Sequence, residues 1–240
     1  MAFENNNMPP CWWVDLPQTE YQQALDLQLA TVNAKTTGRL NADVILCVEH
    51  PRVFTLGRRG GRENLCVSDD FLAEKGVAVM PTDRGGNITY HGPGQLVVYP
   101  IIDLKRRRFK VVDFVSGLEQ AMIQTAKHWG IDAVTDPANR GVWVAGDKLG
   151  SIGITVRRGV SFHGLALNVN TDMEPFGWIN PCGLNQVRMI SFKRHLNVPV
   201  SMVEARQVMA FHLAEILNIT LTTRTVEQLY TGVEGLITLE

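Results

Sequence analysis

Three segments of the chain concentrate residue types that could do chemistry. The first, residues 84–96, reads RGGNITYHGPGQL and places four glycines, an arginine, a histidine and a tyrosine within 13 positions. Glycine there permits positive φ or lets a ligand approach the backbone, which leaves N–H groups free to bind a carbonyl oxygen or a phosphate. A tight hairpin connection explains the same composition, and the segment alone does not decide between the two.

The second region joins the sequence GDKLGSIG, which contains Lys148, with the sequence HGLALN, which begins at His163. The third region is residues 179–183, which contain Cys182. A lysine at a turn is usually solvated, and a lone histidine is more often structural than catalytic. Cys182 stands between Pro181 and Gly183, where a thiol can meet substrate and react if a cation lowers its pKa. A buried structural cysteine is the alternative.

These segments do not match the common nucleotide or metal motifs. Residues 92–94 lack the third glycine and the strand-to-helix context of a dinucleotide fingerprint. Asp147 and Lys148 stand where a Walker loop requires Lys-Ser or Lys-Thr. Neither HxxxH, HExxH nor paired cysteines occur, which argues against a metal site.

Length and charge narrow the class of protein. The chain has 240 residues, 45% hydrophobic and 20% charged, and a formal charge of -1. We expect a single domain over 1–240, with residues 1–12 as the segment expected to be disordered, and no nucleic-acid partner. The N-terminus shows no secretion signal and no apolar run is long enough to span a membrane, so we expect a soluble, cytoplasmic protein with reduced cysteines.

Hydrophobic periodicity predicts helices and strands in a mixed order. Apolar spacing predicts helices over 17–37 and 112–129 and from the Ser201 capping box onward, and strands over 43–48, 77–80 and 96–102. Residues 141–169 contain three apolar runs separated by turn signals, which predict an antiparallel meander. The order indicates an α/β (α+β mixed sheet) fold rather than strict βαβ winding.

Taken together, the three segments resemble the lipoyl(octanoyl) transferase family, often called LipB. Residues 84–104 are similar to the family signature almost throughout, and residues 49–57 are similar as well. The companions follow in order at residues 141–144, 148, 151–153, 163–168 and 181–183. The resemblance spans roughly 45–195, and such an ordered set is far more specific than one motif.

The resemblance implies an acyltransferase with Cys182 and Lys148 as its catalytic pair. Cys182 would take an octanoyl group from octanoyl-acyl carrier protein as a thioester, and Lys148 would move protons. A lysine of a lipoyl domain would then receive the group during lipoate biosynthesis. The implied acceptors are lipoyl domains of 2-oxoacid dehydrogenase complexes and the glycine cleavage H protein. The family implies no cofactor, no metal and no membrane partner.

The resemblance also implies a fold and an acyl site. The fold would be a biotin/lipoate ligase-like catalytic domain, a mixed sheet flanked by helices. The residues expected to line the acyl site are Arg84, Gly85, Gly86, Asn87, Ile88, Thr89, Tyr90, His91, Ser151, Ile152, Gly153, Gly164, Leu165 and Ala166.

Two alternative functions and two finer questions stay open at this point. An ATP-dependent lipoate-protein ligase would share the fold but need no cysteine, and a non-catalytic acyl-binding module would need neither Cys182 nor Lys148. Residues 149–150 and 190–191 depart from the family pattern and leave the acyl-length preference open. The basic run at 105–110 is either a docking site for an acidic carrier protein or a solvated turn.

Overall fold

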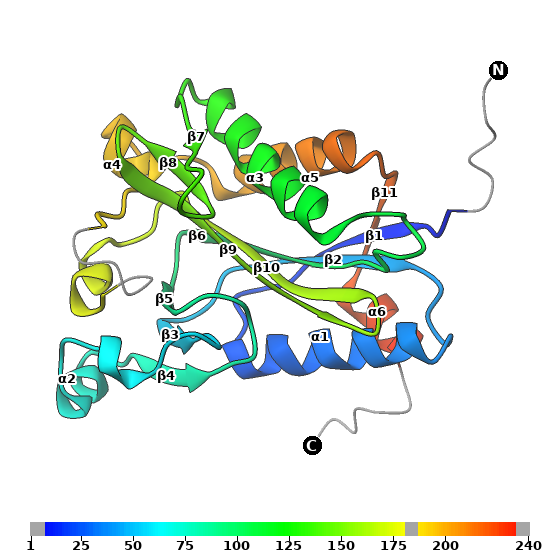
Figure 1. Ribbon diagram of the computed structural model, residues 1–240, viewed down its shortest axis with the longest axis horizontal. Helices are drawn as coiled ribbons and strands as arrows, with labels where there is room; N and C mark the ends of the chain where they lie inside the picture. The colour runs from blue at the N-terminus through cyan, green and yellow to red at the C-terminus, as the bar shows by residue number, and fades with distance from the viewer. Residues whose placement is uncertain (1–7, 181–186, 234–240) are drawn as a thin grey trace.

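A large mixed sheet forms the centre of the molecule (Figure 1). The computed structural model describes residues 8–180 and 187–233. Within them, the eight strands lie in the order β11 (Leu221–Arg224), β1 (Cys11–Asp15), β2 (Asp43–Val48), β6 (Gln95–Ile101), β10 (Val160–Asn168), β9 (Asp147–Arg157), β8 (Val142–Val144) and β7 (Val134–Thr135). Strands β11, β1 and β2 run parallel, and every other neighbouring pair is antiparallel. The predicted mixed sheet and the antiparallel meander of β8, β9 and β10 are confirmed.

Helices cover both faces of this sheet. On one face lie α3 (Val111–His128) and α5 (Met202–Leu217), and on the other lie α1 (Tyr21–Thr36) and α6 (Val226–Val233), as Figure 1 shows. The short helix α4 (Phe192–Leu196) lies near the start of the second described stretch of chain. Ser201 caps α5, because its hydroxyl accepts the Glu204 N–H at 3.3 Å. No helix in the described part of the chain has the length and apolar character needed to cross a membrane.

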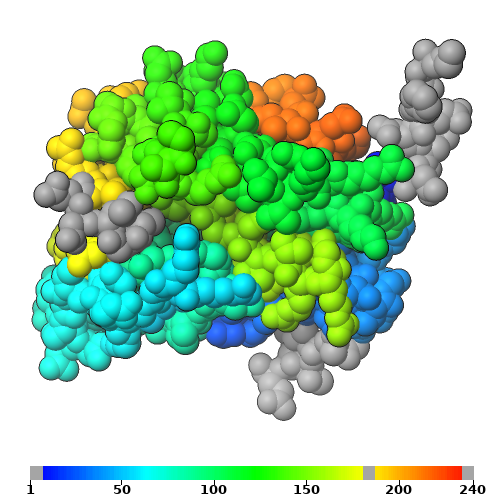
Figure 2. Space-filling model, viewed as in Figure 1, coloured from blue at the N-terminus to red at the C-terminus, as the bar shows by residue number. Residues whose placement is uncertain are grey.

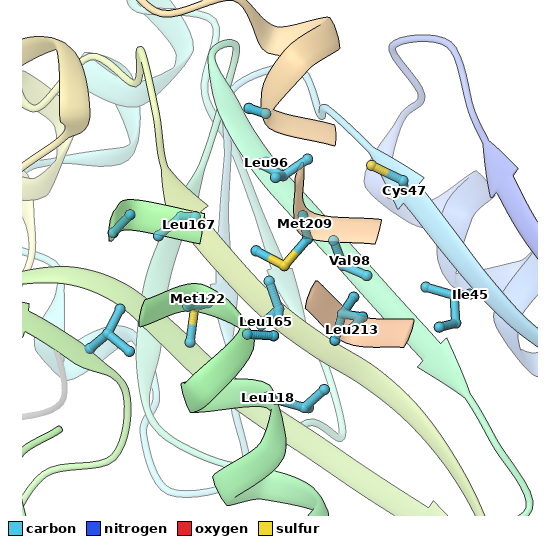
Figure 3. Close-up of a cluster of buried hydrophobic side chains, with 14 of the residues drawn as sticks. Ile45, Cys47, Leu96, Val98, Leu118, Met122, Leu165, Leu167, Met209 and Leu213 are labelled. Atoms are coloured by element: carbon cyan, nitrogen blue, oxygen red, sulfur yellow. The ribbon is translucent and has the colours of Figure 1, made fainter. Parts of the chain in front are cut away.

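Alternating side chains on β6 and β10 build the two halves of the core. Leu96 and Val98 point to the α3 and α5 face, where Figure 3 shows them packed with Leu165, Met122 and Met209. Val97 and Tyr99, one position along, contribute to the apolar cluster on the α1 face. Because successive strand side chains alternate faces, one apolar strand supplies both layers.

A second, smaller sheet stands beside the α1 face. It consists of β4 (Ala78–Pro81), β3 (Val53–Leu56) and β5 (Ile88–His91), with α2 (Asp69–Glu74) and the 3-10 turns η1 (Arg62–Asn64) and η2 (Glu174–Trp178) against it. Its own cluster includes Phe54, Tyr90 and Phe176. The glycine-rich segment 84–94 therefore contains a strand, β5, that its composition did not predict.

The segment expected to be disordered, residues 1–12, includes the start of a strand, while residues 1–7 lie outside the described residues. Cys11 and Trp12 begin β1, with β11 paired on one side and β2 on the other. Cys11 is completely buried in the core. A strand with two neighbours satisfies its backbone groups whatever its flanking composition, which explains the difference.

Asp43, at the start of β2, organises a buried ion cluster. Its carboxylate lies 2.7 Å from Lys35 Nζ and 2.7 Å from Arg107 Nε. The side chains of Asp43, Lys35 and Arg107 are 0%, 4% and 6% exposed. The solvated-turn interpretation of the basic run at 105–110 is therefore wrong for Arg107, since this side chain is needed inside the fold.

We expect Asp43→Ala to lower the free energy of unfolding by about 3–5 kcal/mol, because two buried cations lose their carboxylate. Urea unfolding followed by circular dichroism measures this. Asp69→Ala is the matched control: it removes an ion pair with Arg62 whose side chains are 76% and 52% exposed, and such pairs contribute about 0–1 kcal/mol. Equal effects of the two substitutions would contradict the buried-cluster interpretation.

Candidate active site

A cavity of about 420 Å³ opens between the main sheet, the small sheet and the segment before β8. This volume lies within the range of small-molecule sites. Lys148 and 12 of the 14 residues expected in the acyl site line it, namely Arg84, Gly86, Asn87, Ile88, Thr89, His91, Ser151, Ile152, Gly153, Gly164, Leu165 and Ala166. Folding thus brings the first two sequence segments to one cavity.

Two residues of the expected set lie elsewhere. Tyr90 is buried in the small sheet, with its ring centroid 5.4 Å from that of Phe176. It points away from Thr89 and His91 because neighbouring strand residues face opposite sides. Gly85 N–H donates to Ile154 O at 3.2 Å, so this residue ties the glycine-rich segment to β9.

The close approach at this point requires glycine. A Cβ built on Gly153 would lie 2.6 Å from Gly85 O, closer than real Cβ contacts. The two glycine backbones therefore pack directly against each other, and the cavity wall consists largely of main chain there.

Arg84 fixes the glycine-rich segment to the small sheet. Its Nε donates to Thr55 Oγ1 at 3.0 Å, its Nη2 donates to Thr55 O at 2.6 Å, and its Nη1 donates to Gly85 O at 3.0 Å. The next loop is bound in turn, since Arg58 N–H donates to Arg84 O and Arg59 N–H donates to Gly86 O, both at 3.0 Å. A buried guanidinium with several acceptors gives this wall a defined geometry.

Lys148 is a buried residue of β9. Its relative exposure is 4%, and Nζ lies 5.1 Å from the centre of the Trp143 ring. A Cβ on Gly141 would lie 3.0 Å from Lys148 Cε, so the small residue there makes room for the lysine stem. The solvated-turn interpretation of Lys148 is wrong, because the strand continues through this position and turns its side chain into the cavity wall.

Cys182 lies outside the described residues, together with Pro181 and Gly183. The chain on either side is held by main-chain hydrogen bonds. Before the segment, Asn180 N–H donates to Asn64 O at 2.9 Å. After it, Lys148 N–H donates to Arg188 O at 2.8 Å, and Ile190 N–H donates to Lys148 O at 3.0 Å. The chain therefore resumes directly beside Lys148.

The cavity also contains His163, which the sequence offered as either structural or catalytic, and seven lining residues that sequence reasoning missed, which are Tyr21, Arg59, Val97, Tyr99, Ala138, Asn139 and Arg140. Tyr21 and Tyr99 occupy apolar positions of a helix and a strand, a pattern that predicts core rather than a ligand site. His163 has a positive φ of 55°, which is uncommon for a residue other than glycine. Its Nε2 lies 2.8 Å from Asp83 Oδ1, and burial lowers its pKa although Asp83 opposes that shift.

A group of neutral aromatic rings closes one side of the cavity. His50 Nδ1 lies 2.7 Å from Thr19 O, and its Nε2 lies 2.7 Å from the Tyr99 hydroxyl. Since a carbonyl only accepts, Nδ1 carries the proton and Nε2 accepts from Tyr99. Burial lowers the pKa of His50 to about 4 and holds the pKa of His91 well below its usual range. Tyr21 stacks on His91 with centroids 5.9 Å apart.

This pKa of His50 predicts a loss of stability in mild acid. An unfolded histidine has a pKa of about 6.5, so between pH 6.5 and 4 the unfolded state binds a proton that the folded state does not. Stability from this group is complete above about pH 6.5 and is lost as the pH falls toward 4, by about 2 kcal/mol at pH 4.5. Urea unfolding at pH 7 and 4.5 should show a smaller difference for His50→Gln than for wild type. The exposed His195→Gln control should retain the wild-type difference, and an unchanged difference in both variants would contradict the assignment.

Comparison with known proteins agrees with this geometry. Residues 20–214 match the lipoyl protein ligase A/B catalytic domain. An octanoyltransferase from Desulfotalea psychrophila is 45% identical over 207 residues, which cover 85% of this chain and 93% of that protein. An octanoyltransferase from Syntrophobacter fumaroxidans is 42% identical over 216 residues, which cover 90% of this chain and 94% of that protein.

A solved structure supports the fold. A bi-partite lipoate protein ligase from Thermoplasma acidophilum aligns with a TM-score of 0.72 and 17% identity, covering 95% of this chain and 92% of that chain. At this identity the likeness concerns the fold alone, and it confirms the predicted lipoate ligase-like catalytic fold. The chain belongs to the lipoyl protein ligase A/B catalytic domain family, and its sequence relatives within that family are octanoyltransferases.

Proposed function

We propose that this protein is an octanoyltransferase that moves an octanoyl group from octanoyl-acyl carrier protein, through a Cys182 thioester, to a lysine of a lipoyl domain. The observation that carries the proposal is the cavity in which the glycine-rich segment, residues 151–153 and residues 164–166 meet the buried Lys148. The octanoyltransferase relatives cover most of the chain, which supports the same reaction.

In the first half-reaction the Cys182 thiolate attacks the carbonyl carbon of the donor thioester. The new C–S bond to Cys182 forms as the C–S bond to the carrier breaks, and the carrier thiolate leaves. Lys148 takes the Cys182 proton beforehand and returns a proton to the departing carrier thiolate. The donor is already activated, so this half-reaction needs no nucleotide.

In the second half-reaction the neutral amine of the acceptor lysine attacks the Cys182 thioester. The amide C–N bond forms, the C–S bond to Cys182 breaks, and Lys148 accepts the proton that the nitrogen loses. Glycine backbone around the cavity supplies N–H groups of the kind that stabilise the oxyanion formed in both steps.

The strands that border the cavity extend far enough to accommodate a linear acyl chain. Along β9, the distance from Lys148 to Gly153 is roughly 16 Å at a rise of about 3.3 Å per residue. Across the sheet, Gly153 on β9 pairs with Gly164 on β10, and β10 pairs in turn with β6. The width from β9 to β6 is therefore two strand spacings, or about 10 Å. Lys148 and Tyr99 therefore lie at opposite ends of this strip of sheet, and Val97 and Ala166, which share the face of Tyr99, lie between them. The side chains of Ile152 and Leu165 pack into the core on the opposite face, so only their main chain borders the cavity.

Intact-protein mass spectrometry tests the proposal. We incubate the enzyme with octanoyl-acyl carrier protein and no ATP, then add a lipoyl domain. The expected results are a hydroxylamine-sensitive octanoyl adduct on the enzyme and its loss as the lipoyl domain gains the group. Modification of the lipoyl domain only when ATP is added would identify a lipoate-protein ligase instead.

A further inference from the structure

The rim of the cavity differs in chemistry from its interior. Most lining side chains are buried or half-buried, whereas Arg59, Ala138 and Arg140 are exposed. Arg59 belongs to the loop after β3, and Arg140 precedes β8. In Figure 2 the cyan region after β3 faces the green region before β8 on this side of the molecule. The exposed part of the cavity lining therefore includes two arginines from separate parts of the fold.

Both arginines have hydrogen-bonding capacity available at this rim. No side chain or main-chain group in the described part of the chain binds the Arg59 guanidinium. Arg140 Nη1 donates to Glu119 Oε2 at 2.9 Å, but its side chain remains 54% exposed. A guanidinium carries five N–H donors, so this one contact leaves most of the Arg140 fork available to a ligand.

The neighbouring carboxylates are already engaged. Glu119 also accepts the Gly141 N–H at 2.9 Å. Asp83 accepts from His163 and lies 3.3 Å from Arg157. On the outer side, Asp136 accepts the Ala138 N–H at 2.7 Å. These contacts leave the Arg59 charge uncompensated by a described carboxylate, so the rim favours an anionic ligand group.

We propose that Arg59 and Arg140 bind the phosphate group of the thiol-bearing arm that delivers the acyl chain. This inference rests on the proposed function and names how the donor is recognised. A thioester held at Lys148 must have its remaining arm leave toward solvent, and Arg59 and Arg140 are exposed cations among the residues that line the cavity. Guanidinium groups bind phosphate oxygens through paired hydrogen bonds, which a lysine cannot form.

The shared ligand chemistry is a phosphopantetheine thioester, which occurs both on carrier proteins and in coenzyme A. The experiment compares four donors: octanoyl-pantetheine, octanoyl-phosphopantetheine, octanoyl-coenzyme A and octanoyl-acyl carrier protein. For each, kcat/KM of acyl-enzyme formation is measured by quenched-flow mass spectrometry. The variants are Arg59→Gln and Arg140→Lys, and the control is Arg39→Gln, an exposed arginine on the loop after α1.

The decisive quantity is the ratio of kcat/KM for octanoyl-phosphopantetheine to that for octanoyl-pantetheine. We expect wild type and Arg39→Gln to share a high ratio, and Arg59→Gln to lower it about tenfold or more, because a charge-assisted hydrogen bond is lost. Arg140→Lys keeps the charge opposite Glu119 and should lower the ratio through loss of the planar fork. The ratio should also fall with added salt.

Each other outcome overturns the inference. An equal loss of kcat/KM for both small donors in Arg59→Gln would show a role in shaping the cavity. A loss with octanoyl-acyl carrier protein alone would place Arg59 against the carrier surface rather than the phosphate. If none of the four donors acylates the wild-type enzyme, the proposed octanoyltransferase function itself is contradicted. Failure of the phosphate-binding inference is thereby distinguished from failure of the proposed function.

Discussion

Cys182→Ser is expected to form no hydroxylamine-sensitive octanoyl adduct and to lower kcat for octanoyl transfer by at least about 10⁴-fold, the order found when a nucleophile that acts as a unit with its base is removed. A serine hydroxyl stays protonated near neutral pH, so it cannot replace a thiolate. Mass spectrometry of the enzyme and of the lipoyl domain measures both quantities in one reaction.

The matched control is Cys66→Ser, because Cys66 is an exposed free cysteine in the described part of the chain. This variant should acquire the wild-type adduct at the wild-type rate. An adduct that persists in Cys182→Ser and disappears in Cys66→Ser would move the nucleophile to the other thiol. Adducts on both variants would show labelling without site selectivity and would contradict the thioester mechanism.

Lys148→Met is expected to slow acyl-enzyme formation by about 10²- to 10⁴-fold, the range for a positioned acid or base. Methionine retains an unbranched stem against Trp143, so the effect should come from the missing amine rather than from a cavity. The Tm should therefore change far less than the rate. Stopped-flow or quenched-flow acylation with octanoyl-acyl carrier protein gives the rate constant.

A second readout separates proton transfer from a structural role of Lys148. The rate at which iodoacetamide alkylates Cys182 reports the fraction of thiolate, and Lys148→Met should lower that rate and shift its pH profile upward. The control Lys127→Met replaces an exposed lysine on α3 and should keep the wild-type profile. Slow acylation with an unchanged alkylation profile would mean that Lys148 positions the donor and does not activate the thiol.

Secondary structure followed closely from local pattern. The strand expected at 43–48 is β2, and the helix expected at 112–129 is α3 at Val111–His128. In both cases apolar spacing or a run of branched residues coincides with the face that is buried. Strands β1, β5 and β11 were not predicted, because each is stabilised by pairing with distant strands rather than by its own composition.

The candidate site shows the same division. The family resemblance, carried by an ordered set of motifs, implied Lys148 and 12 of the residues that line the cavity. It also implied Cys182, which lies outside the described residues. Tyr21 and Tyr99 were not predicted to line the cavity, because an aromatic residue in a core and an aromatic residue at a cavity have the same local sequence pattern. Their role depends on which elements stand opposite them.

The sequence by itself determined the family and the helices and strands with strong periodicity, and it nominated Cys182 and Lys148 as the candidate catalytic residues. Only the tertiary structure decided that Lys148 is buried in a cavity wall, that Arg107 is held inside by Asp43, and that Arg59 and Arg140 line the same cavity. Burial, ion pairing and convergence depend on contacts between residues far apart in the chain. Local sequence carries the propensity of each segment but not the partner against which it packs.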